Sequence, residues 1–224
     1  MFTRIPALLL GFALVTLAHA ADPFEAGKQY FIIEPQQPTS TGDKIEVLEV
    51  FSYGCPACNQ FQATIKKLKA ELPANTELTY LPASFNPSED WPVFQRAFLA
   101  AQTLGVTDKT HDATYDAIWK DDGALRISDL KTHRLVSPLP TIEDVAKFYA
   151  GLGVNKDDFL GAANSFAVNM KMKRADAQIK TYGVDSTPTL IINGKYRFTG
   201  SSAGGLDNTV ALAKFLIAKE SAGK

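Results

Sequence analysis

The chemistry-bearing residues of this chain are two closely spaced cysteines, Cys55 and Cys58. Two thiols at this spacing can hold part of a metal site, form a structural disulfide, or exchange disulfides with other thiols. A structural zinc site takes four ligands, and His111 and His133 are 22 positions apart, which is not finger spacing. A structural disulfide here would close a very short loop and stabilise little. Disulfide exchange is therefore the favoured interpretation.

A strand followed by a helix is expected to position the pair. Residues 45–51 are rich in β-branched and apolar side chains, which predicts a strand. Gly54 ends it, Pro56 suits the first turn of a helix, and Pro73 ends that helix. Between the two prolines, apolar residues recur at the spacing of one helix face: Phe61, Ile65, Leu68 and Leu72.

This placement distinguishes the two thiols. Cys55 falls at the predicted helix N-terminus, where unpaired amides and the helix dipole favour an anion. A thiolate is the nucleophilic form of cysteine, so we expect Cys55 to react with substrate. Cys58 lies one turn further in and faces the domain, so we expect it to be the resolving thiol.

Glu49 is an unexpected residue in a strand that should be buried on both faces. A buried carboxylate is costly unless it is neutral or paired. One interpretation is that the strand is shifted or that Glu49 reaches solvent. The functional interpretation is a buried acid that carries protons to and from Cys58.

A second strand region lies near the C-terminus. Residues 189–192 and 195–198 flank Asn193-Gly194, the strongest short signal of a β-hairpin. Pro188 stands at the first strand's start, where a missing N–H is tolerated.

The N-terminus predicts export. Arg4 precedes a largely apolar stretch at residues 5–17 and a small-x-small site at residues 18–20. We expect a signal peptide over residues 1–20, with an uncleaved membrane tether as the alternative. The remaining chain is long enough to fold without stabilising disulfides. The full chain's net charge of −1 and its dispersed basic residues do not indicate a nucleic-acid-binding surface.

Residues 47–52, 54–58, 187–188 and 192–196 together resemble the DsbA family of bacterial thiol:disulfide oxidoreductases. The resemblance implies an α/β thioredoxin fold with an inserted all-helical domain. It also implies the domain boundaries: 21–87 and 171–224 for the thioredoxin-fold domain, and 88–170 for the insert. Within the insert we expect helices after Pro92 and from Thr141 to about Gly151, and one helix from about Asn155 to Gly183.

The same resemblance assigns site residues. Glu49 matches the family's buried acid, Cys55 its nucleophile and Cys58 its resolving thiol. Pro188 matches a cis-proline that faces the cysteines, and Thr187 offers backbone hydrogen bonds to the substrate. Pro56 and Ala57, which lie between the cysteines, are also expected to contact the substrate.

The predicted function is donation of the Cys55–Cys58 disulfide to newly exported, unfolded proteins in the periplasm. The resemblance implies reoxidation by a membrane quinone-linked partner of the DsbB type, a monomer, and neither metal nor cofactor. The alternatives are a disulfide isomerase or reductase, and a peptide-binding chaperone whose cysteines are incidental.

Two departures from the family pattern are visible. Ala57 replaces the histidine often found between the cysteines of the strongest oxidants, so we expect a milder oxidant. The stretch 131–141, with two prolines, is longer than the family's usual connection, and its sequence suggests no role.

Overall fold

The computed structural model describes residues 22–223, so the predicted signal peptide at residues 1–20 lies outside the described residues. The strands form a mixed sheet in the order β1–β5–β4–β2–β3. β2 is parallel to β3 and antiparallel to β4, and β5 is antiparallel to β4 and β1. The strand bounds are Phe31–Ile32 (β1), Ile45–Phe51 (β2), Thr76–Pro82 (β3), Thr189–Ile192 (β4) and Tyr196–Thr199 (β5).

Both strand regions predicted from the sequence are confirmed. β2 covers the predicted residues 45–51, and every one of them is buried. The β4–β5 hairpin turns at Asn193 and Gly194, whose φ angles of 52° and 63° suit a tight turn. A side chain at Gly194 would collide with the carbonyl of Gln37, so glycine is required there by contact as well as by conformation.

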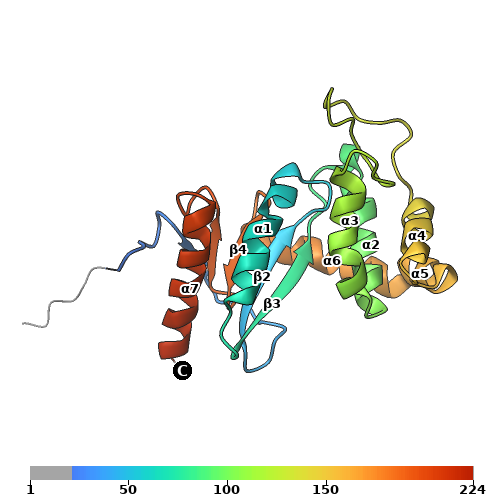
Figure 1. Cartoon of the computed structure of the whole chain (residues 1–224). Helices are drawn as coiled ribbons and strands as arrows, with labels where there is room; N and C mark the ends of the chain where they lie inside the picture. The colour runs from blue at the N-terminus through green and yellow to red at the C-terminus, as the bar shows by residue number, and fades with distance from the viewer. Residues whose placement is uncertain (1–21, 224) are drawn as a thin grey trace, which may run out of the picture.

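Helices cover both faces of the sheet and build a separate layer beside it (Figure 1). Their bounds are Pro56–Ala70 (α1), Trp91–Thr103 (α2), Thr107–Trp119 (α3), Ile142–Gly151 (α4), Lys156–Ala163 (α5), Phe166–Thr181 (α6) and Leu206–Ala222 (α7). α1 and α7 pack on the face of β2 that carries Val47, whereas the second half of α6 packs on the face that carries Leu48 and Val50.

Helices α2 to α5 and the first half of α6 form what we call the helical part. The helix predicted from Thr141 is confirmed as α4, with Thr141 as its N-cap. The prediction of one helix from about Asn155 to Gly183 is wrong. The helix ends at Ala163, and Ser165 starts a new one by accepting a hydrogen bond from the Val168 N–H at 3.1 Å.

The predicted domain boundary at residues 170–171 falls within α6. Val168, near the start of α6, is buried in the core of the helical part, whereas Ala175 and Ile179 pack on the sheet. One helix therefore belongs to both parts and links them. The division of the chain into domains stays a prediction.

Candidate active site

Cys55 is the N-cap residue of α1, and Pro56 occupies the first helical turn. The backbone of Cys55 is extended (φ −86°, ψ 117°), which turns its sulfur back over the helix N-terminus. Cys55 Sγ accepts a hydrogen bond from the Cys58 N–H at 3.4 Å. The sequence prediction that Cys55 stands at a helix N-terminus is confirmed.

The environment of Cys55 favours its thiolate. Its pKa is lowered to about 6, chiefly by a hydrogen bond from the Cys58 side chain. Burial opposes this shift, while the Thr187 side chain and the backbone N–H groups of Cys58 and Ala57 support it. At neutral pH the sulfur is therefore largely in its nucleophilic form.

Cys58 has the opposite character. Its side chain is fully buried, and both cysteines are free thiols in this structure. Burial raises the pKa of Cys58 well above its usual value, and the neighbouring Cys55 and Glu49 add to the effect. The pair thus combines one thiol that ionises readily with one that holds its proton.

Glu49 lies on β2 beneath this pair, and its side chain is completely buried. Neither carboxylate oxygen has a hydrogen-bond partner among the described residues. Its pKa is raised to about 8, chiefly by burial and in addition by the charge of Cys55. The alternatives that the strand is shifted or that Glu49 reaches solvent are wrong, because β2 has the predicted bounds and the Glu49 side chain is completely buried.

Thr187 and Pro188 are far from the cysteines in the sequence but lie next to them in the structure. The Thr187–Pro188 peptide bond is cis, as the family resemblance implies. When Cys55 is protonated, its thiol donates to the Thr187 carbonyl oxygen at 3.5 Å. A segment 132 positions away in the sequence thereby forms one wall of the active site.

A groove with a volume of about 460 Å³ lies beside the pair. Ala57 and Gln60 of α1 face Thr187 and Pro188 across it. The far wall comes from the segment between β5 and α7 and from the half-exposed Leu206, the first residue of α7. Three of the predicted substrate-contacting residues thus line one groove, while Pro56 is exposed at the start of α1 outside its lining.

The helical part also fixes the loop that precedes Cys55. The sequence did not predict these contacts. The Tyr53 hydroxyl hydrogen-bonds with His111 Nδ1 at 2.9 Å, and Trp119 Nε1 donates to the Tyr53 carbonyl at 2.8 Å. A Cβ on Gly54 would lie 2.8 Å from the Trp91 ring, so only glycine fits. The aromatic residues near the cysteines were the one sequence signal that could have pointed to these contacts.

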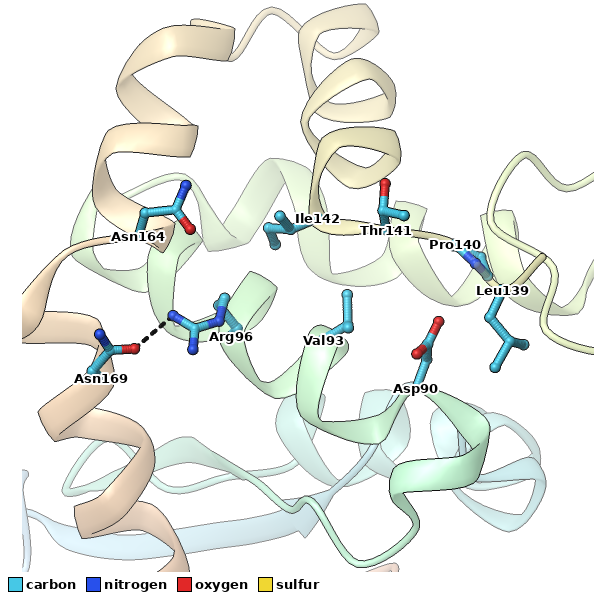
Figure 2. A pocket seen from close by; sticks show the side chains of 9 residues that line it. All are labelled: Asp90, Val93, Arg96, Leu139, Pro140, Thr141, Ile142, Asn164 and Asn169. Carbon is cyan, nitrogen blue, oxygen red and sulfur yellow. Dashed lines mark hydrogen bonds between the residues drawn. The ribbon is translucent and has the colours of Figure 1, made fainter.

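A second hollow, of about 470 Å³, lies within the helical part (Figure 2). Figure 2 shows Asp90, which precedes α2, and Val93 and Arg96 of α2 facing the residues near the starts of α4 and α6. Arg96 donates to the Ala163 carbonyl at 2.6 Å and to Asn169 Oδ1 at 2.8 Å. This arginine therefore ties α2 to the α5–α6 junction, which is a structural role.

Two further findings concern residues 22–223. In this range no group of three or more His, Cys, Asp or Glu side chains is arranged to hold a metal ion. Over the same residues no helix combines the length and the apolar character needed to cross a membrane.

Comparison with known proteins gives a consistent result. Residues 42–210 match the family model described as Thioredoxin. The chain is 39% identical over 218 residues to thiol:disulfide interchange protein DsbA of Pseudomonas aeruginosa, covering 97% of this chain and 96% of that protein. It is 40% identical over 205 residues to DsbA of Pseudomonas syringae pv. tomato, covering 92% and 88%. The crystal structure of Pseudomonas aeruginosa DsbA superposes with a TM-score of 0.76 at 40% identity, covering 91% of this chain and 97% of that one.

Proposed function

Because this chain belongs to the DsbA family of thiol:disulfide oxidoreductases, which catalyse dithiol–disulfide exchange, we propose that it donates a Cys55–Cys58 disulfide to newly exported proteins. The observation that carries the proposal is the contrast between the two thiols. A disulfide oxidises others well when its own reduced form is stabilised. The lowered pKa of Cys55 stabilises the reduced form as a thiolate at neutral pH.

The reaction proceeds by two thiolate attacks. A substrate thiolate attacks Cys55 Sγ, the S–S bond breaks, and Cys58 leaves with the electron pair and takes up a proton. A second substrate thiolate then attacks the substrate sulfur of the mixed disulfide, and Cys55 leaves as a thiolate. In total, two substrate thiols are oxidised to a disulfide, two protons are released from them, and the Cys55–Cys58 disulfide is reduced by two electrons.

Glu49 is proposed as the proton carrier for Cys58. Both side chains are buried, so Cys58 cannot exchange its proton directly with water. A pKa of about 8 places Glu49 near neutrality, where a group can both give and take a proton. The step that depends most on Glu49 is attack by Cys58 on a mixed disulfide, since the thiol must first lose its proton.

The substrate is proposed to lie as an extended chain in the groove beside Cys55. Thr187 and the adjacent cis-proline shape one wall, and Ala57 shapes the other. The proposal also includes reoxidation by a DsbB-type partner in the membrane, action in the periplasm after removal of residues 1–20, and a monomeric state. They are supported by the family relationship and by the N-terminal sequence pattern.

A single-turnover assay tests the function. Stoichiometric oxidised protein should transfer its disulfide to a reduced, unfolded model protein, and a Cys55→Ser variant should transfer none. Equal gain of active model protein with the Cys55→Ser variant would instead support the alternative of a chaperone with incidental cysteines. A protein that reshuffled wrong disulfides but introduced none would be an isomerase.

A further inference from the structure

The segment between α3 and α4, whose length departs from the family pattern, folds into a hairpin. The Val136 N–H donates to the Ile127 carbonyl at 3.0 Å, and Ser128 bridges to Leu135 in antiparallel fashion. The Asp129 N–H then donates to the carbonyl of Arg134 at 2.9 Å. We call residues 125–136 the 125–136 hairpin.

The tip of the hairpin is held in one conformation by Asp129. Its Oδ1 accepts from the Lys131 N–H at 3.0 Å, from the Thr132 N–H at 2.7 Å and from the Thr132 hydroxyl at 3.0 Å. The His133 N–H closes the turn on the Asp129 carbonyl at 2.8 Å. These bonds lower the pKa of Asp129, so its negative charge is stabilised by hydrogen bonds within the turn.

The base of the hairpin is anchored in the core that surrounds the cysteines. The Leu125 N–H donates to the Ala117 carbonyl of α3 at 2.9 Å. Leu125 and Ile127 are both buried, in the same apolar cluster as Cys55 and Cys58. The hairpin is thus a fixed projection from the body of the protein.

The hairpin projects at the active-site end of the molecule. Trp119, which ends α3 just before it, donates to the carbonyl of Tyr53, two positions before Cys55. Figure 1 shows the connection between α3 and α4 rising above the helical part, at the end of the molecule where α1 begins. A chain bound at Cys55 can therefore extend toward it.

The outer surface of the tip is cationic with one apolar residue. Lys131 and Arg134 are exposed, and neither forms an ion pair with another residue of 22–223. Leu135 is 48% exposed beside them. Residues 125–136 contain three cationic side chains and one carboxylate, that of Asp129, so the hairpin has a net positive charge.

We propose that the 125–136 hairpin binds acidic segments of protein substrates while their cysteines react at Cys55. Two unpaired cations on a rigid projection favour an anionic partner, and the neighbouring active site favours a polypeptide as its source. This inference rests on the proposed function, since it specifies which unfolded chains react fastest. The contact is electrostatic and non-covalent, so it should act on the rate of encounter.

The dimensions of the hairpin define the probe. Six residues along the chain separate its base at Leu125 from its tip at Lys131, so it reaches at most about 20 Å. A substrate acid should therefore lie roughly six to ten residues from the reacting cysteine. Two reduced peptides, each with one cysteine pair, are needed: one with four Asp or Glu residues at that separation, and one with Asn or Gln at the same positions.

The experiment compares initial rates of peptide oxidation by the oxidised full chain. The wild type should oxidise the acidic peptide about fivefold faster than the neutral one at low ionic strength, and the ratio should fall toward one at high salt. A Lys131→Glu/Arg134→Glu variant should lose the preference and keep the wild-type rate on the neutral peptide. A matched Lys156→Glu/Lys180→Glu variant, altered at exposed lysines of α5 and α6, should keep the preference.

Three outcomes would overturn the inference. Equal rates for both peptides with the wild type would show that the hairpin does not select acidic chains, while the proposed function would stand. Oxidation of neither peptide would remove the proposed function and the inference with it. Equal peptide rates together with hairpin-dependent co-sedimentation on vesicles of anionic phospholipid would assign the cationic tip to a membrane surface.

Discussion

Replacing Ala57 with histidine should make this protein a stronger oxidant. Ala57 is exposed in the first turn of α1, and its backbone N–H already supports the Cys55 thiolate. Its methyl group offers neither charge nor hydrogen bond. A histidine there keeps the backbone contact and adds a side chain that can donate toward the sulfur.

The size of the effect follows from the ionisation of Cys55. A fall in pKa from 9.0 to about 6 stabilises the reduced form at pH 7 by about 1.4 kcal/mol relative to an ordinary thiol, or about 30 mV for a two-electron couple. This stabilisation is fully present above pH 9, and it is lost as the pH falls through 6. Each further unit that histidine removes from the pKa adds about 30 mV at pH 7, and one charge-assisted hydrogen bond supplies roughly that much.

Two measurements check this prediction together. Ultraviolet absorbance of the thiolate against pH gives the pKa of Cys55, and equilibration with glutathione gives the potential. Ala57→Gln serves as a control for size without positive charge, and it should move both quantities less. If Ala57→His changed neither the pKa nor the potential, backbone amides alone would satisfy the thiolate, and the assignment of position 57 as a tuning position would be wrong.

Four further predictions follow from three contacts of the structure. Glu49→Gln should stabilise the reduced protein by about 3 kcal/mol at pH 7 but little at pH 4.5. The reason is that the raised pKa of Glu49 makes the free energy of unfolding of the wild type fall as the pH rises from 4.5 through 8. A stabilisation by Glu49→Gln that did not depend on pH in denaturant titrations would contradict this. The same change should slow formation of the mixed disulfide and its reversal by Cys58, since Cys58 gains or loses a proton in both, while leaving attack by the second substrate thiol unchanged, as quenched-flow trapping would show. Gly54→Ala should cost about 1–3 kcal/mol by overpacking against Trp91, and a Trp91→Leu change in the same chain should recover part of it in a double-mutant cycle. Arg96→Met should lower the free energy of unfolding by about 1–3 kcal/mol through loss of its two hydrogen bonds, with no change in reduction potential.

Local patterns in the sequence predicted the local structure well. The β-branched run of β2 and the apolar spacing of α1 placed Cys55 at a helix N-terminus, which the structure confirms. The Asn-Gly turn predicted the β4–β5 hairpin. The helix predicted from Asn155 to Gly183 failed because apolar periodicity continues across the break, while a single serine cap at Ser165 starts a new helix.

Contacts between distant segments could not be read from spacing. Nothing in the local sequence brings Thr187 to Cys55, and only the family resemblance suggested it. The hydrogen bond between Tyr53 and His111 joins the sheet to the helical part, and it has no local signature. Apolar periodicity also gave no signal for the 125–136 hairpin, whose turn is held by side-chain bonds from Asp129.

The redox state of Cys55 and Cys58 in cells at steady state tests the central claim most directly. Cells grown without added reductant can be quenched in acid, and their thiols alkylated with a reagent large enough to shift the protein on a gel. The proposed function predicts a mostly oxidised pair, because a disulfide donor must be kept oxidised between turnovers. A mostly reduced pair would contradict it and would identify an isomerase or reductase.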